Sequence, residues 1–298
     1  MDANINIMKN VLTGERLQRW FVAHAWDENS QGGEDGILER VFELIPGTDR
    51  WCCEFGAWDG RKYSNTHYLI AKRGWSGVLI EADSTKFKDL ERTYAGNDKV
   101  FLINRFVEYA GDGLLDNLLS NTPMPVDFDL LSIDIDGNDY HVWAAVEYYR
   151  PKVVIIEYNQ TIPNHIEFVQ VADPSVCHGN SLLSLTKLAV KKGYQLVAVT
   201  DTNGIYVREE FFPLFGIDDN TLAAMLPVAP CVTDIFQLYD GTVVLSGCQQ
   251  MLWHGVPMKS KCFQIVPRWL RTFPGSMGKV KFFLFKVWRT LYRLINPS

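Results

Sequence analysis

The sequence predicts an α/β fold in which a mostly parallel sheet carries helices on both faces. From about residue 50, short apolar runs rich in β-forming residues alternate with segments of helical spacing, which is the pattern of successive βαβ units. The expected strands at 77–82 and 153–158 begin with the continuous apolar runs GVLI and VVII, as expected of strands that helices bury on both sides. A length of 298 residues suits one principal domain with appendages.

The elements of this domain follow one another regularly along the chain. Six strands are expected at 51–55, 77–82, 100–104, 128–134, 153–158 and 195–200, and a seventh at 205–207. Helical spacing occurs between them at 62–73, 84–94, 112–119, 138–149 and 180–192. We therefore expect a seven-stranded sheet within residues 50–208.

Segments on both sides complete the expected organisation. Residues 1–49 are predicted to form an N-terminal helical cap, whose segment 23–45 is expected to cap the sheet and reach toward the ligand site. Residues 209–275 contain many Pro and aromatic residues and are interpreted as an irregular C-terminal extension. Residues 276–298 form a distinct, basic segment that is interpreted as an amphipathic helix.

Composition and charge exclude several classes of protein. With 29 Lys and Arg against 35 Asp and Glu, the net charge of -6 argues against a nucleic-acid-binding body. The six cysteines form no C-x-x-C pair and are interpreted as reduced thiols. The N-terminus lacks the pattern of a secretory signal and no window is apolar enough to span a bilayer, so a cytoplasmic location is expected.

A loop of small residues follows the first predicted strand. Small residues let the backbone turn tightly and approach a ligand without interference from Cβ atoms. The same composition also fits an ordinary turn between a strand and a helix. The candidate cofactor contacts in this loop are Glu54, Gly56, Ala57, Asp59 and Gly60.

The end of the second predicted strand supports a nucleoside cofactor. Glu81 stands there, followed by Ala82, at the place where a carboxylate accepts hydrogen bonds from ribose hydroxyls. The loop lacks G-x-G-x-x-G and the chain lacks a phosphate-binding G-x-x-x-x-G-K-[ST], which disfavours dinucleotides and nucleoside triphosphates. S-adenosylmethionine has no phosphates and fits better.

The fourth predicted strand runs into three carboxylates, Asp134, Asp136 and Asp139. At the carboxyl edge of a sheet they can position a substrate, act as a base, or bind a divalent metal ion through Asp134 and Asp136. Asp139 also fits the start of the following helix, where an acid complements the helix dipole. These alternatives stay open on the sequence alone.

Further candidates follow the fifth predicted strand. Glu157 and Asn159 are expected to face the same cleft, as a catalytic and a substrate-binding residue. His165 and His178 lie in the next loop, His165 as a candidate base and His178 as a candidate substrate contact. A lone loop histidine is more often simply solvated.

Taken together, these residues make the chain resemble the FkbM-type methyltransferase family over residues 28–208. The resemblance is closest to a branch with E-F-G-A-x-D-G followed by S-N-T. The matching segments are SQGGEDGIL (30–38), EFGAWDG (54–60), SNT (64–66), GWSGVLIEAD (74–83), SIDIDGNDYHVW (132–143), VVIIEYN (153–159) and SLLSLTKLAVKKGYQLV (181–197).

The resemblance implies the Rossmann-like fold of class I methyltransferases. It also implies S-adenosylmethionine bound by the first loop, Asn65 of the S-N-T motif and Glu81, with methyl transfer to a hydroxyl oxygen of a glycan or secondary metabolite. The chain departs from better-studied members in reading D-I-D-G-N-D where those read D-x-E-G-x-E, so their acceptor preferences do not carry over directly.

Two other functions compete with this one. The D-x-D at Asp134 and Asp136 resembles the manganese motif of nucleotide-sugar glycosyltransferases, a function that leaves the first loop and Glu81 unexplained. A protein that binds the cofactor without turnover is the other alternative, since no single residue is an unmistakable catalyst.

The segment 279–295 is predicted to be an interfacial helix that contacts an anionic membrane at the inner face. At about 100° per residue, its basic residues form one stripe and its apolar residues cover the other side, with Lys281 and Phe282 as exceptions. Pro274, Gly275 and Gly278 suggest a hinge before it. The alternative is that the apolar face packs on the protein's own body.

Overall fold

The computed structural model describes residues 23–226, 229 and 231–297. Residues 1–22 of the expected cap, three residues of the expected extension and Ser298 lie outside the described residues. The chain divides into two compact units, Met1–Ala229 and Pro230–Ser298, and each is described by itself.

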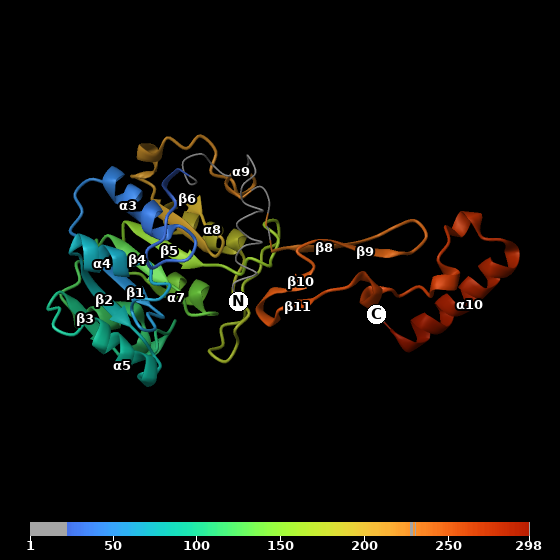
Figure 1. Cartoon of the computed structure of the whole chain (residues 1–298), viewed down its shortest axis with the longest axis horizontal. Coiled ribbons are helices and arrows are strands. Elements are labelled where there is room, and N and C mark those ends of the chain that lie inside the picture. Colours follow the sequence, from blue (N-terminus) through green and yellow to red (C-terminus); the bar gives the residue numbers. More distant parts are fainter. Residues whose placement is uncertain (1–22, 227–228, 230, 298) are drawn as a thin grey trace. The chain divides into compact units, whose positions relative to one another are not determined.

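The first unit is built on a seven-stranded sheet with the order β3-β2-β1-β4-β5-β7-β6 (Figure 1). All neighbours are parallel except β7, which runs antiparallel to β5 and β6. The predicted α/β fold, Rossmann-like with a mostly parallel seven-stranded sheet, is confirmed. The strands are β1 (Trp51–Phe55), β2 (Ser76–Ile80), β3 (Val100–Ile103), β4 (Leu130–Ile133), β5 (Val153–Glu157), β6 (Tyr194–Val199) and β7 (Asn203–Arg208).

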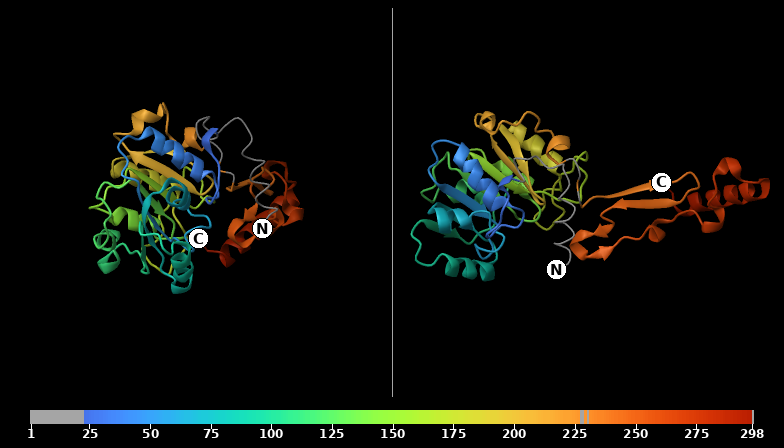
Figure 2. Two further views of the ribbon diagram at one scale, coloured as in Figure 1. Left: turned by 60° about the vertical axis from the view of Figure 1, so that its left-hand side comes forward. Right: turned by 45° about the horizontal axis from the view of Figure 1, so that its top comes forward.

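Helices cover both faces of this sheet (Figures 1 and 2). One apolar core joins the sheet to α3 (Glu34–Leu44), α4 (His67–Arg73) and α5 (Ser84–Thr93), and the other joins it to α6 (Leu115–Leu119), α7 (Asp139–Ala145) and α8 (Leu182–Lys191). Because both of its faces are buried, β5 is apolar along Val153–Ile156 without alternation.

Strand register brings four strand ends into one row. Phe55 of β1 lies opposite Ile80 of β2 and Ile133 of β4, and Ile133 lies opposite Ile156 of β5. The residue that follows each of these stands at the carboxyl edge of the sheet, where α/β proteins bind ligands. In spatial order, these residues are Glu81, Gly56, Asp134 and Glu157.

The expected extension at 209–275 is shared between the two units. Phe215, in a 3₁₀ turn, and Met225 of α9 (Leu222–Met225) are buried in the cores of the first unit. The second unit contains the antiparallel pairs β8 (Thr233–Gln237) with β9 (Val243–Gly247) and β10 (Gln250–Met251) with β11 (Val256–Pro257). The part of the expected irregular extension that lies in the second unit therefore contains two antiparallel strand pairs, which its Pro and Gly residues did not lead us to predict.

The second unit ends in α10 (Lys279–Ile295), as the sequence predicts for this segment (red in Figures 1 and 2). Within the described residues, no helix has both the length and the apolar character that crossing a membrane requires.

Candidate functional site

A cavity of about 660 Å³ opens at the carboxyl edge of the sheet in the first unit. This volume lies in the range of small-molecule and cofactor sites. Its wall includes Gln31, which belongs to the segment 23–45 that was expected to reach toward the site. The sequence-predicted residues that line it are Glu54, Gly56, Ala57, Glu81, Ala82, Asp134, Asp136 and Glu157.

Glu81 is held in place by the backbone around it. Its Oε2 accepts a hydrogen bond from the Trp58 N–H at 2.8 Å, and its Oε1 accepts one from the Asp83 N–H at 2.7 Å. The side chain is buried yet lines the cavity. Each carboxylate oxygen can accept a further hydrogen bond, so a fixed acceptor faces the cavity.

Glu54 holds the chain that follows the first loop rather than offering a free carboxylate. Its Oε2 accepts hydrogen bonds from the hydroxyls of Ser64 at 2.6 Å and Thr66 at 2.7 Å, and its Oε1 accepts from the Asn65 N–H at 2.9 Å. Asn65 is buried, donates from Nδ2 to Ser132 and does not line the cavity. The S-N-T motif is therefore a partner of Glu54, and it delays the start of α4 to His67 instead of residue 62.

Asp59 and Gly60 are not among the residues that line the cavity. Asp59 accepts hydrogen bonds from the backbone N–H groups of Arg61 and Lys62, which closes the turn. Gly60 has φ +69°, and a Cβ atom there would stand 2.4 Å from the Leu90 side chain. Both residues shape the loop, and neither is placed to touch a ligand in the cavity.

The loop residues after β5 lie outside the cavity lining as well. Asn159 donates a hydrogen bond to the His178 carbonyl oxygen and accepts one from Thr161, so it holds the loop together. The side chains of His165 and His178 are exposed. Among the residues that line the cavity, the groups suited to proton transfer are thus the carboxylates, not a histidine.

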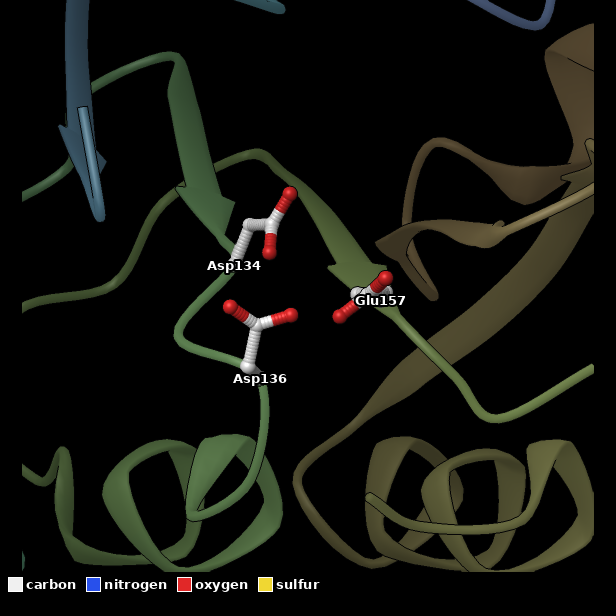
Figure 3. A group of neighbouring side chains, drawn as sticks. All are labelled: Asp134, Asp136 and Glu157. Atoms are coloured by element: carbon white, nitrogen blue, oxygen red, sulfur yellow. The ribbon is translucent and has the colours of Figure 1, made fainter. Parts of the chain in front are cut away.

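Asp134, Asp136 and Glu157 form a compact acidic cluster (Figure 3). One carboxylate oxygen from each lies within 4.8 Å of the others. Burial, and then the negative charges of Asp139 and Asp136, raise the pKa of Asp134 to about 7. Burial and the charge of Asp134 raise the pKa of Glu157 further, and the two side chains are hydrogen-bonded. At neutral pH the pair therefore still holds a proton, which stays on Glu157, and Asp134 is the first of the two carboxyl groups to ionise.

Backbone geometry aims Asp136 at this pair. Asp136 has φ +59°, in the left-handed region that Asp tolerates better than most residues. Asp139 secures the turn, since its Oδ1 accepts from the Ile135 N–H at 2.9 Å and its Oδ2 accepts from the Gly137 N–H at 2.8 Å. Asp139 is also the first residue of α7, as its interpretation as a helix-start residue predicts. The same side chain thus begins the helix and holds the turn that carries Asp136.

An aromatic and basic rim was missed by the sequence reasoning. Trp58 and Tyr63 are exposed and have φ +49° and +60°, conformations that bulky side chains seldom adopt. The Lys62 Nζ lies 5.3 Å and 4.8 Å from their ring centroids, and the Lys86 Nζ lies 4.9 Å from the Trp58 ring. Phe106 is also exposed at the rim. The sequence feature that could have indicated this rim is Trp58, an aromatic residue in a loop that otherwise consists mainly of small residues.

The oxygen ligands of this cavity suit either a proton or a hard cation. Three carboxylates at such distances can bind a divalent ion with water or substrate completing the coordination. They can equally hold a proton and release it to act as a base. Trp58 and Glu81 also line the cavity, and an aromatic ring and a fixed carboxylate suit a nucleoside.

Comparisons with known proteins find fold similarity only. No protein-family model matches the chain, and no curated protein matches it. A solved structure of the CMeT domain of the citrinin polyketide synthase has a TM-score of 0.41 and 10% identity over 58% of this chain, which spans half of that chain.

Two bacterial structures are similar in the same way. A SAM dependent methyltransferase from Aquifex aeolicus matches 59% of this chain and 89% of its own with 10% identity and a TM-score of 0.39. A putative caffeoyl-CoA O-methyltransferase from Staphylococcus aureus matches 68% of this chain and 91% of its own with 14% identity and a TM-score of 0.38. With TM-scores below 0.5, these similarities add no weight to the assignment of site residues or of function.

Proposed function

We propose that the chain is an S-adenosylmethionine-dependent methyltransferase of the FkbM type that methylates a hydroxyl oxygen of a glycan or secondary metabolite. One observation carries the proposal: four adjacent strand ends supply a small-residue loop, an anchored carboxylate and a proton-sharing carboxylate pair to a single cavity. The first two suit a nucleoside that lacks phosphates, and the third suits an acceptor that must lose a proton.

The cofactor half of the cavity is formed by the ends of β1 and β2. Glu81 would accept hydrogen bonds from the two ribose hydroxyls, because its carboxylate is fixed by the Trp58 and Asp83 N–H groups and still has acceptor capacity. Gly56 and Ala57 would let the methionine moiety approach the backbone. When bound, S-adenosylmethionine supplies a methyl group on an already activated sulfonium, which leaves as a neutral thioether.

The acceptor half is formed by the ends of β4 and β5. Asp134 would take the proton of the acceptor hydroxyl. The acceptor oxygen would then receive the methyl group as the bond from that methyl group to sulfur breaks. A pKa of about 7 lets Asp134 be ionised and still basic at neutral pH. Glu157 stays protonated and donates a hydrogen bond to the Asp134 carboxylate, so one negative charge rather than two has to be stabilised. Positioning by the cavity supplies the remaining acceleration.

The rim supports a ring-shaped acceptor. Trp58, Tyr63 and Phe106 present exposed aromatic faces that can pack on the apolar faces of a sugar or a polyketide ring. Lys62 and Lys86 stand beside them and favour an acceptor that carries negative charge.

Calorimetry of S-adenosylmethionine and S-adenosylhomocysteine binding tests the proposal. Wild-type protein is expected to bind both, and Glu81→Gln is expected to weaken binding roughly 5- to 150-fold, because it removes a charged acceptor worth about 1–3 kcal/mol. Glu91→Gln, on the exposed surface of α5, is the matched control and should bind as the wild type does. Equal affinity of the Glu81 and Glu91 variants would remove Glu81 from the site.

The competing functions give different results in the same experiment. Binding of a UDP-sugar with Mn²⁺, without binding of S-adenosylmethionine, would make the Asp134-x-Asp136 motif that of a glycosyltransferase. Tight cofactor binding without transfer of a labelled methyl group to any glycan or metabolite extract would favour a non-catalytic protein.

A further inference from the structure

The C-terminal part of the chain carries a charge opposite to that of the whole protein. Residues 241–298 contain nine Lys and Arg and no Asp or Glu, although the chain as a whole has a net charge of -6. A basic segment without acidic neighbours attracts a negatively charged surface over distances of about a Debye length. Helix α10 concentrates five of these nine charges.

One side of α10 is an exposed apolar surface. At about 100° per residue, seven apolar side chains occupy an arc of roughly 120° without a polar interruption. Their exposed fractions run from 42% to 78%, and no residue of the helix is buried. We call them the apolar arc: Val280, Phe283, Leu284, Val287, Leu291, Leu294 and Ile295.

A basic stripe borders the apolar arc. It consists of Lys279, Lys286, Arg289 and Arg293, all exposed. Within the described residues, none of the four forms an ion pair. The Lys286 Nζ lies 4.7 Å from the Phe282 ring centroid, so its partner is an aromatic ring and its charge is not neutralised by an acid.

The third side of α10 attaches the helix to its own unit. Lys281 donates a hydrogen bond to the Thr272 hydroxyl at 2.5 Å. Phe285 and Trp288 are half-buried, and ring contacts connect Phe285, Trp288 and Tyr292 along this side at centroid distances of 5.9 Å and 5.5 Å. This accounts for Lys281, which broke the sequence pattern. The described residues of the second unit leave the apolar arc and the basic stripe exposed.

We propose that α10 lies in the surface of an anionic membrane, with the apolar arc among the lipid chains and the basic stripe at the phosphate groups. A helix of 17 residues is about 25 Å long and carries five charges, so it suits the interface and not a transmembrane path. Basic residues beside a broad apolar face are the features of interfacial helices. This inference does not depend on the methyltransferase proposal.

Two other partners match the helix less well. A second copy of the chain would bring the same basic stripe against this one, and the two stripes would repel. A nucleic acid would neutralise the stripe but would leave the apolar arc in water. An anionic lipid surface satisfies both.

Vesicle flotation of the full-length protein tests the proposal. The protein is expected to float with phosphatidylcholine vesicles that contain phosphatidylglycerol, and to float less at high salt or with phosphatidylcholine alone. Lys286→Glu with Arg289→Glu should lower partitioning by at least roughly 25-fold, since each basic residue near an anionic surface contributes about fivefold. Lys88→Glu with Lys191→Glu, two exposed lysines of the first unit, is the matched control.

The apolar arc is tested separately. Leu284→Gln with Leu291→Gln should lower partitioning by roughly tenfold or more per leucine, whereas Val171→Gln with Val190→Gln, at two more exposed positions in the first unit, should not. Melting temperatures of all variants should stay near that of the wild type, because every changed residue is exposed.

Several results would overturn the proposal. They are absence of flotation with phosphatidylglycerol, equal flotation of wild type and both α10 variants, binding of an oligonucleotide in place of vesicles, and a dimer that the Leu284 and Leu291 substitutions dissolve without any vesicle binding.

Discussion

Gly56 and Asp134 approach each other so closely that a Cβ atom at position 56 would stand 1.7 Å from the Asp134 carbonyl oxygen. The contact joins the end of β1, with the small-residue loop, to the end of β4, with the acidic cluster. Gly56 also has φ +74°. Any side chain here must push the two halves of the cavity apart.

Gly56→Ala is therefore expected to destabilise the protein and to distort the cavity. The positive φ alone costs about 1 kcal/mol, and displacement of the β4 end adds to it, for a total of roughly 3 kcal/mol or more. Gly96→Ala is the control, since Gly96 has φ +78° with open space around its missing Cβ. Chemical denaturation should show a much larger loss in the free energy of unfolding for Gly56→Ala than for Gly96→Ala. Similar losses would mean that the backbone at Asp134 moves away from a Cβ atom at position 56 without destabilising the protein.

Glu54→Gln is expected to act on stability before it acts on ligand binding. The substitution keeps the shape but removes the charge that accepts from the Ser64 and Thr66 hydroxyls and the Asn65 N–H. We expect a loss of about 1–3 kcal/mol in the free energy of unfolding. Cofactor affinity measured below the melting temperature should change little, and Glu91→Gln should change neither quantity. A stable variant that no longer binds cofactor would return Glu54 to the binding site.

The elements that periodicity defines well were predicted from the sequence. Apolar runs such as 153–158 became strands because burial on both faces demands continuous apolar residues, and their ends placed Glu81, Asp134 and Glu157 at one edge. The sequence could not separate residues that face the cavity from residues that hold its walls. Asn65 and Gly60 belong to the second group because of partners far away in the chain, Ser132 and Leu90.

Loops limited the prediction for a similar reason. Asn159, His165 and His178 follow a strand that ends at the site, but the loop carries them out of the cavity lining. Trp58 and Tyr63 line the cavity because their backbone has left-handed conformations, which no periodic pattern in a sequence predicts. The sequence did not predict the hairpins of the second unit. A two-stranded pair such as β8 with β9 leaves most of its residues exposed, so it lacks the pattern of buried apolar residues by which a strand is predicted.

Divalent cations are expected to leave the melting temperature of the protein nearly unchanged at neutral pH. The proton shared by Asp134 and Glu157 already relieves the repulsion in the cluster, and a cation would have to displace it. Thermal unfolding with Mg²⁺, Mn²⁺ or EDTA measures this, with Asp136→Asn as the comparison. A rise in melting temperature with Mn²⁺ that disappears in the Asp136 variant would show that the cluster binds a metal ion.

Asp134→Asn is expected to stabilise the protein at alkaline pH while abolishing most of its activity. The pKa of Asp134 is raised on folding from its ordinary value to about 7. The folded state therefore favours the protonated acid, and the stability associated with it is fully present below about pH 4 and is lost as the pH rises through 7. Asparagine cannot ionise, so the melting temperature of the variant should fall less between these limits and should exceed that of the wild type at pH 8. Asp112→Asn, at an exposed aspartate, is the control and should follow the wild-type curve.

The same variant tests the role of Asp134 in activity. Methyl transfer to a responsive acceptor should drop by roughly 10²- to 10⁴-fold in Asp134→Asn, which is the usual contribution of a general base. The wild-type rate should rise with pH through about 7 as Asp134 ionises. If the variant keeps wild-type activity, Asp134 is not the base. A stability curve parallel to that of the wild type would instead mean that Asp134 is ionised throughout this range.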